Sequence, residues 1–307
     1  MNDLILDTDI GRDIDDLLAL LFLLSRHDVN LRAITCTPGR TSQIELLSAI
    51  LSQCRRNDIP VGMPETHDIE YKHVADHYHT LLEQHIERPD RFLKPYRSDD
   101  LLYDIIRETP EITVISIGPL TNIRRLLYRH DDVRIRRIYA MGGYIDINDG
   151  LPFPKKFRGL PYCPEHNFSG DRPAAHTLFA APNVAGKYFV SKNITHLSVI
   201  PGYFINDLKL SKRRFDNRPL ELLATVLDRY FRKASAKKFH DPLTVCAALN
   251  HSLVKYREVT MLESDRAWGA RPEKGTGLYI STWFDHEAFY KMFLADFLNP
   301  ASGATPC

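Results

Sequence analysis

The chain has 307 residues, of which 44% are hydrophobic and 26% are charged, and this composition excludes the disordered, collagen-like and fibrous classes. Lysines and arginines number 40 and aspartates and glutamates 39, so the formal net charge of +1 gives no electrostatic reason to expect a nucleic-acid partner. The longest apolar run, Leu17 to Leu24, is too short to cross a bilayer.

The five cysteines are scattered and form no Cys-x-x-Cys pair, a pattern typical of reduced thiols rather than of a disulfide framework or a zinc site. The first residues show no basic region followed by an apolar stretch, which a secretory signal would need. We therefore expect a cytoplasmic protein whose partners include neither nucleic acid nor a membrane.

Strand and helix patterns alternate through the first half of the chain. The expected strands cover residues 4–6, 31–37, 59–62, 112–117 and 135–141, and the expected helices contain residues 17–24, 44–51, 102–106 and 120–128. This alternation requires crossover connections, and it predicts a mostly parallel central sheet with helices on both faces. Ligands of such sheets bind beyond the carboxyl ends of the strands.

The pattern loosens after Gly143. We expect a long loop over residues 146–164, a helix over 172–181, a strand around 188–190, and helices over 219–236 and 285–298. No linker divides the chain, so the sequence predicts one α/β domain with insertions, spanning residues 1–307.

Five carboxylates follow the first expected strand within ten residues, from Asp7 to Asp16. Like charges this close repel one another unless something compensates them. The start of the next helix offers partial positive charge to Asp15 and Asp16, and a divalent cation would compensate them more completely. Oxygen ligands favour calcium or magnesium over zinc, so the run predicts a metal site.

Two other acidic motifs are alternatives to this interpretation. An EF-hand loop counted from Asp7 would need glycine and a carboxylate where Arg12 and Leu18 stand, so that interpretation fails. A haloacid-dehalogenase-type phosphatase also begins with Asp-x-Asp after a strand, with Asp7 as nucleophile and Asp9 as acid. The sequence resembles that family only weakly, and a phosphatase remains an alternative.

A series of ordered motifs resembles the inosine-uridine preferring nucleoside hydrolase family. The acidic run leads into Leu17-Leu18-Ala19, and the later landmarks are Gly118-Pro119-Leu120-Thr121-Asn122, Met141-Gly142-Gly143, Glu165-His166-Asn167, Asn193-Ile194-Thr195-His196 and His240-Asp241-Pro242. They span most of the chain in the family's order, which makes the resemblance far more specific than one acidic motif.

The resemblance implies a calcium ion and hydrolysis of the bond between ribose and a nucleobase. The implied metal ligands are Asp9, Asp16, Asp241 and the backbone carbonyl of Ile117, and Asp9 would also be the general base on a water. The implied ribose ligands are Asp15, Glu165 and Asn167, and His240 would lie near the leaving base. These roles agree with the chemistry, because carboxylates stabilise an electron-poor ribose and histidine can donate a proton near neutral pH.

Some features depart from the family pattern. The spacing from Asp9 to Asp16 is two residues longer than usual, so Asp13 is an alternative to Asp15 as a ribose ligand. Arg40 stands where the family usually has asparagine, and its guanidinium could bind a phosphate or an acidic substituent. Residues 66–87 carry several histidines in place of a recognisable flap, and we expect an exposed helix there.

The leading functional hypothesis is a calcium-dependent N-ribosyl hydrolase that acts on a small-molecule nucleoside, with a preference for a modified or 5′-phosphorylated one. The alternative from another class is a non-catalytic protein that binds a nucleoside or another ribosyl ligand. The resemblance also implies a homodimer or a homotetramer.

Overall fold

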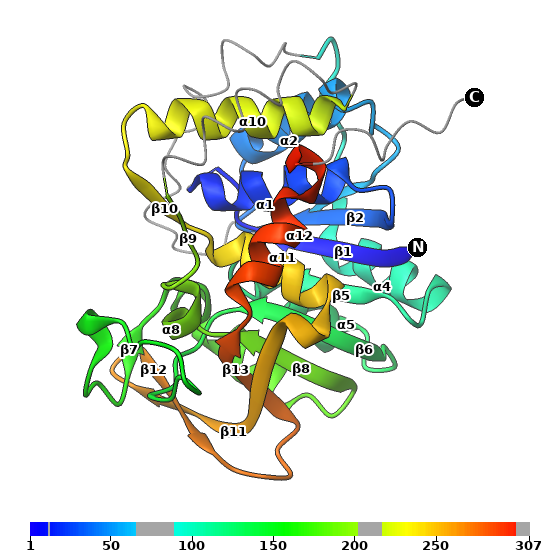
Figure 1. Ribbon diagram of the computed structural model, residues 1–307. Helices are drawn as coiled ribbons and strands as arrows, with labels where there is room; N and C mark the ends of the chain where they lie inside the picture. The colour runs from blue at the N-terminus through cyan, green and yellow to red at the C-terminus, as the bar shows by residue number, and fades with distance from the viewer. Residues whose placement is uncertain (12, 66–88, 202–216, 299–307) are drawn as a thin grey trace.

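The computed structural model describes residues 1–307 except 12, 66–88, 202–216 and 299–307. Within that part of the chain, eleven strands form one sheet in the order β4-β3-β2-β1-β5-β6-β8-β13-β11-β12-β7, and β10 and β9 form a separate pair (Figure 1). The strands are β1 (Asn2–Thr8), β2 (Val29–Cys36), β3 (Val61–Met63), β4 (Tyr96–Arg97), β5 (Thr113–Ser116), β6 (Ile135–Met141), β7 (Cys163–Pro164), β8 (Val184–Val190), β9 (Val199–Pro201), β10 (Ala236–Lys238), β11 (Val254–Ser264), β12 (Ala267–Pro272) and β13 (Leu278–Phe284).

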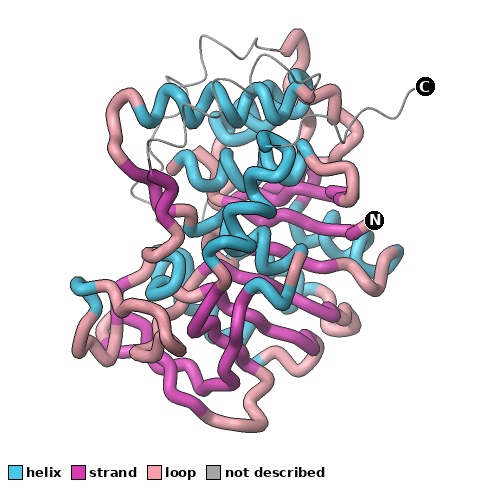
Figure 2. The backbone as a smooth tube through the Cα atoms, in the orientation of Figure 1, coloured by secondary structure: helices cyan, strands magenta, loops and turns pink. Residues whose placement is uncertain are grey.

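Helices connect most of the strands, as Figure 2 shows. They are α1 (Ile14–Ser25), α2 (Thr41–Gln53), α4 (Ser98–Glu108), α5 (Thr121–Arg129), α6 (His166–Gly170), α7 (Arg172–Ala180), α8 (Lys192–Thr195), α10 (Arg218–Phe231), α11 (His240–Leu249) and α12 (His286–Leu298), with short 3-10 turns η2 (Lys155–Phe157) and η3 (His251–Leu253). Among the described residues, no helix is long and apolar enough to cross a membrane.

The expected α/β fold is confirmed. Every neighbouring pair of strands from β4 across to β13 is parallel. Beyond β13 the sheet continues antiparallel through β11, β12 and β7. The sequence patterns did not reveal β11, which is largely half-exposed and lacks the continuous apolar run of a buried parallel strand. They also missed β12 and β13, although β13 is largely buried and pairs parallel with β8.

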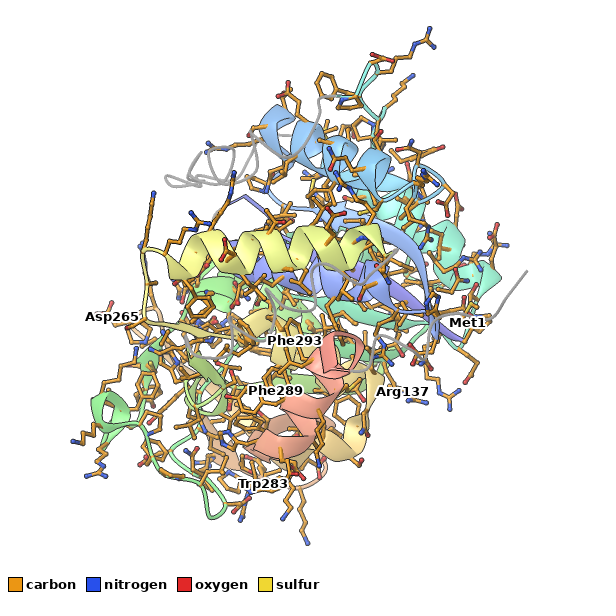
Figure 3. The ribbon with its side chains drawn as sticks, turned by 45° about the horizontal axis from the view of Figure 1, so that its top comes forward. Met1, Arg137, Asp265, Trp283, Phe289 and Phe293 are labelled. Atoms are coloured by element: carbon orange, nitrogen blue, oxygen red, sulfur yellow. The ribbon has the colours of Figure 1, made fainter. Side chains whose placement is uncertain are left out.

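The strands bury both faces, because successive side chains of a strand point to opposite sides of the sheet. In β1, Leu4 and Leu6 join the hydrophobic cluster that includes α1, α10, α11 and α12, while Ile5 joins the cluster that includes α4, α5 and α7. Figure 3 labels Phe289 and Phe293 of α12, both buried in the first cluster. The two clusters keep the sheet rigid, so its strand ends form a fixed platform.

Two expected elements end differently in the structure. The helix expected over 219–236 ends at Phe231, because residues 236–238 hydrogen-bond to β9 as strand β10. The strand expected at 59–62 is β3, and it begins only after Pro60, whose carbonyl accepts a hydrogen bond from the backbone N–H of Ile34. The helix expected over the histidine-rich segment lies outside the described residues.

Candidate active site

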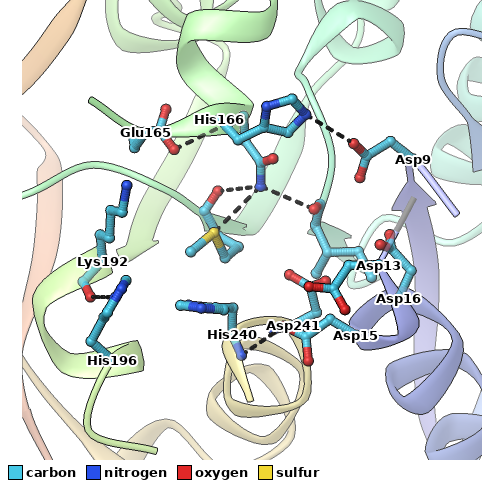
Figure 4. Close-up of a pocket in the computed structure, with 13 residues that line it drawn as sticks. Asp9, Asp13, Asp15, Asp16, Glu165, His166, Lys192, His196, His240 and Asp241 are labelled. Carbon is cyan, nitrogen blue, oxygen red and sulfur yellow. Dashed lines mark hydrogen bonds and ion pairs between the residues drawn. The ribbon is translucent and has the colours of Figure 1, made fainter. Parts of the chain in front are cut away.

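A pocket of about 280 Å³ lies at the carboxyl ends of the parallel strands. The residues that line it are Asp9, Asp13, Asp15, Asp16, Ile117, Met141, Glu165, His166, Asn167, Lys192, His196, His240 and Asp241. Figure 4 shows two opposed groups, which we call the acidic wall (Asp9, Asp13, Asp15, Asp16 and Asp241) and the basic wall (Lys192, His196 and His240). Every residue that the sequence assigned to the site lines this pocket except Arg40.

A buried polar network around Asp7 holds together the strand ends next to the acidic wall. The fully buried Asp7 carboxylate accepts hydrogen bonds from Thr35 Oγ1 (2.8 Å), Ser116 Oγ (2.9 Å) and Asn122 Nδ2 (2.8 Å). These bonds tie the ends of β1, β2 and β5 to the start of α5. Burial raises the pKa of Asp7 to about 6 even though these hydrogen bonds lower it.

The loop after β1 passes close to the loop after β5. A Cβ atom on Gly118 would lie 2.7 Å from the backbone nitrogen of Asp9, so only glycine allows this approach. Thr8 Oγ1 donates a 2.5 Å hydrogen bond to Asp16 Oδ1, which links the strand to the first turn of α1. The two contacts fix where Asp9 and Asp16 face the pocket.

Asp15 connects the two ends of the chain. Its Oδ2 accepts hydrogen bonds from the backbone N–H groups of His240 (2.9 Å) and Asp241 (3.3 Å) at the start of α11. Its Oδ1 lies 3.5 Å from the ammonium of Lys237, which is only 5% exposed and also binds Asp13 at 2.8 and 2.9 Å. Asp15 Oδ1 is buried and has no hydrogen-bond partner among the described residues, whereas both Asp13 oxygens accept hydrogen bonds from Lys237 and the Asp13 side chain is 53% exposed.

The pKa values of the acidic wall reflect uncompensated charge. Burial, followed by the charge of Asp9, raises the pKa of Asp16 well above its ordinary value, and burial and the charge of Asp16 do the same for Asp241. Burial raises the pKa of Asp15 to about 6, although Lys237 lowers it. Among the described residues, no lysine or arginine forms an ion pair with Asp9, Asp16 or Asp241, and Lys237 forms its ion pairs with Asp13 and Asp15.

Glu165 and Asn167 approach the pocket from the short helix α6. The Glu165 carboxylate accepts hydrogen bonds from the backbone N–H groups of Asn167 (3.2 Å) and Phe168 (2.5 Å) and so caps that helix. Burial raises the pKa of Glu165 to about 7. The Asn167 amide nitrogen donates hydrogen bonds to the backbone carbonyls of Ile117 and Met141, both at 2.9 Å. These two bonds fix the orientation of the Asn167 side-chain amide, including its oxygen.

The basic wall is built on α8 and the start of α11. His196 Nδ1 lies 2.8 Å from the carbonyl of Lys192, His240 Nδ1 lies 2.6 Å from Thr195 Oγ1, and the rings of His196 and His240 meet edge to face with centroids 5.0 Å apart. Burial and nearby lysines lower the pKa of His196 to about 3. Burial, followed by His196 and the lysines, also lowers the pKa of His240 well below its usual value. Both rings are therefore neutral near pH 7.

Sequence patterns missed several residues that shape this pocket. His166 Nε2 lies 3.5 Å from Asp9 Oδ2, and Lys192, His196 and Lys237 contact other site residues. His166 stands between Glu165 and Asn167 and could have been selected for that reason. Lys237 lies three residues before His240, but no motif signals its ion pair with Asp13.

Arg40 lies apart from this group. It precedes α2, it is exposed, and it is not among the described residues that line the pocket. The structure therefore does not bring Arg40 together with the other predicted substrate ligands.

The sequence matches the inosine-uridine preferring nucleoside hydrolase family over residues 4–291. The chain belongs to that family. It is 27% identical over 273 residues to the pyrimidine-specific ribonucleoside hydrolase RihA of Enterobacter sp. (strain 638), covering 81% of this chain and 80% of the relative. Family membership assigns the chain as an N-ribosyl hydrolase and favours that activity over the phosphatase alternative.

Solved structures share the fold at lower identity. A plant nucleoside hydrolase superposes with a TM-score of 0.75 at 24% identity, covering 96% of this chain and 98% of its own. A purine-preferring ribonucleoside hydrolase from Gardnerella vaginalis superposes with a TM-score of 0.77 at 19% identity, covering 99% of this chain and 100% of its own. These likenesses establish the architecture alone.

Proposed function

We propose that this nucleoside hydrolase family member cleaves the N-glycosidic bond of a ribonucleoside in a calcium-dependent reaction and releases the base and ribose. The observation that carries the proposal is the meeting of Asp9, Asp16 and Asp241, from opposite ends of the chain, with Glu165 and His240 in one pocket. A parallel sheet brings these groups together at its carboxyl edge, where substrates bind.

The proposed metal ligands are Asp9, Asp16, Asp241 and the carbonyl oxygen of Ile117. As the described side chains stand, no group of three or more histidine, cysteine, aspartate or glutamate residues is arranged to hold an ion. The donor chemistry fits a hard cation, because all the donors are oxygens and because burial, followed by the neighbouring carboxylates, raises the pKa values of Asp16 and Asp241. Binding therefore requires these carboxylates to draw together.

When bound, calcium would supply positive charge that lowers the pKa of a coordinated water and orients the ribose diol. The chain's own residues perform the remaining steps. Asp9 takes the proton of the attacking water, and His166, 3.5 Å away, orients the Asp9 carboxylate. The carboxylates of the acidic wall stabilise the positive charge that develops on the ribose as the bond to the base breaks.

Glu165 and Asn167 bind the ribose hydroxyls in this proposal. The Asn167 amide nitrogen is engaged with two backbone carbonyls, so its oxygen is the atom that accepts a hydroxyl proton. Asp15 is better placed than Asp13 to contact the sugar, because its Oδ1 has no hydrogen-bond partner among the described residues, whereas both Asp13 oxygens accept hydrogen bonds from Lys237. The Nδ1 atom of His240 faces Thr195, which leaves its Nε2 atom to meet the base.

A preference for a modified or 5′-phosphorylated nucleoside remains part of the proposal. Arg40, on which the sequence argument for a phosphate depended, is not among the residues that line the pocket, whereas Lys192 is. We also retain the expectations of a cytoplasmic enzyme and of a homodimer or homotetramer.

The test is release of ribose from a panel of nucleosides, measured with calcium, after chelation, and after calcium is restored. We expect chelation to abolish ribose release and calcium to restore it. Asp9→Ala should lower kcat about 10³-fold, because general-base catalysis contributes factors of this order. Nucleoside binding without ribose release under all conditions would contradict the proposal and support the alternative of a non-catalytic binder.

A further inference from the structure

Lys192 is a charged residue of the pocket that the proposed reaction does not use. It begins α8, one residue beyond β8, and lines the pocket opposite the acidic wall (Figure 4). Its ammonium donates one hydrogen bond, to the backbone carbonyl of Pro164. An ammonium has three donors, so Lys192 keeps further donors for a ligand.

Lys192 forms no ion pair with a carboxylate within the part of the chain that the structure describes. The lysines that form ion pairs there are Lys237 and Lys291. The acidic residue nearest in sequence to its hydrogen-bond partner is Glu165, whose carboxylate instead accepts two backbone N–H groups. The charge of Lys192 lowers the pKa of Glu165, so the two groups lie within each other's field, but no carboxylate of the described residues holds the Lys192 ammonium in a direct ion pair.

Two further lysines add to the positive potential on this side. The pKa of Lys156 is lowered by burial and by the charges of Lys238 and Lys192, and the pKa of Lys238 is lowered by burial, Lys237 and Lys192. Such mutual effects require the ammonium groups to lie within each other's field. The Lys156 ammonium lies over the Phe157 ring, 4.7 Å from its centroid, and that ring packs edge to face on His196 at 4.7 Å.

The histidines of the basic wall do not contribute this charge. The His196 ring donates through Nδ1 to the Lys192 carbonyl, so its Nε2 atom carries a lone pair. The permanent positive charge facing a ligand on this wall therefore belongs to Lys192.

We propose that Lys192 makes this enzyme selective for ribonucleosides whose base carries a negative charge, such as a ring carboxylate. The inference rests on the proposed function, since it places the base against the wall that contains His240. An anionic group there would meet the ammonium of Lys192, which lines the same pocket as His240. A 5′-phosphate is the other source of negative charge, but Lys192 shares its wall with His240, the residue assigned to the base.

The direct test compares nicotinic acid riboside with nicotinamide riboside, which differ in a carboxylate against a carboxamide of nearly the same shape. With calcium present, we expect kcat/KM for ribose release to be at least about tenfold higher for the acid, which corresponds to one additional favourable charge contact. Lys192→Met should abolish this ratio and Lys192→Arg should retain it. Lys155→Met, an exposed lysine of η2 that does not line the pocket, should retain the wild-type ratio.

A second measurement does not depend on turnover. Calorimetric titration of free nicotinate and free nicotinamide should show tighter binding of nicotinate to the wild type and no difference for Lys192→Met. A third arm compares uridine with uridine 5′-monophosphate, and a phosphate preference that depends on Lys192 would overturn the assignment of the charge to the base.

These outcomes separate the two proposals. Ribose release with equal kcat/KM for the acid and the amide, or a preference that survives Lys192→Met, would overturn the selectivity and leave the hydrolase function intact. Absence of ribose release from every nucleoside would refute the hydrolase function, and the nicotinate titration would still decide whether Lys192 binds the anion.

Discussion

On the acidic wall of the pocket, burial raises the pKa values of Asp15, Asp16 and Asp241, whereas on the basic wall burial lowers those of His196 and His240. In both cases burial disfavours the charged form of the side chain. The walls differ in their neighbours, because several lysines lower the pKa values of the histidines further, while Lys237 is the one lysine of the described residues that forms an ion pair with the carboxylates. The carboxylates of the acidic wall therefore need a bound cation to compensate their charge, whereas the basic wall already contains the positive charge of Lys192.

The largest effect expected to sharpen this comparison concerns His240. His240→Ala should lower kcat for a nucleoside with a neutral base about 100-fold, because it removes the group placed to donate to that base. The loss should be smaller for an anionic base, whose charge Lys192 still contacts. Steady-state ribose release measures both, with the exposed His27→Ala as control. Equal losses of kcat for the two bases would contradict the proposal that His240 acts on a neutral base and Lys192 on an anionic one.

Lys237 tests the electrostatic division of the acidic wall itself. Lys237→Met should lower the free energy of unfolding by about 3 kcal/mol, since it leaves the buried Asp15 carboxylate without its counter-charge. Urea denaturation measures the change, and Lys233→Met, an exposed lysine after α10, is the matched control. Asp15→Asn in the Lys237→Met background should recover part of the loss, because the uncompensated charge is then removed. Additive effects in this double-mutant cycle would contradict the contact.

Glu165 provides a pH-dependent test. Its pKa is raised to about 7 by burial from an ordinary value of 4.5, so the folded state binds the proton more tightly than the unfolded state. The resulting stability is fully present below pH 4.5 and is lost as the pH rises through 7. Relative to Glu165→Gln, the wild type should therefore lose about 3 kcal/mol of unfolding free energy between pH 4.5 and pH 7.5. Parallel stability curves for the two proteins would show that the buried carboxyl does not titrate in this range.

The smallest expected effect concerns Arg40, which lies on neither wall. Arg40→Ala should change kcat/KM for uridine and for uridine 5′-monophosphate by less than about twofold, as is usual for exposed positions away from a site. A loss confined to the 5′-monophosphate would restore Arg40 as a phosphate ligand.

Much of the acidic wall could be predicted from sequence. Asp9 and Asp16 follow a strand, and Asp241 belongs to a motif in the family's order, so the parallel topology alone brings them to one edge. The role of Asp15 was harder to predict from the sequence, because its partners are backbone N–H groups of α11 and a lysine far along the chain. Relative to the family's usual form, the two additional residues before Asp15 bring in Asp13, which binds that same lysine.

The basic wall was harder to foresee. His240 came from a motif, but Lys192 and His196 face the pocket only because α8 turns directly after β8. A helix of four residues is too short for hydrophobic periodicity to predict which way it points. The antiparallel strands beyond β13 were missed for a related reason, since half-exposed strands resemble loops in composition.

The bond from the backbone of His240 to Asp15 spans 225 residues of sequence. A nascent chain that lacks its last quarter would carry the clustered aspartates with neither the lysine nor the helix start that anchors them. The enzyme should consequently become active only late in its synthesis, once residues 237–241 are present. C-terminally truncated fragments that retain the whole first half of the chain should show no hydrolase activity.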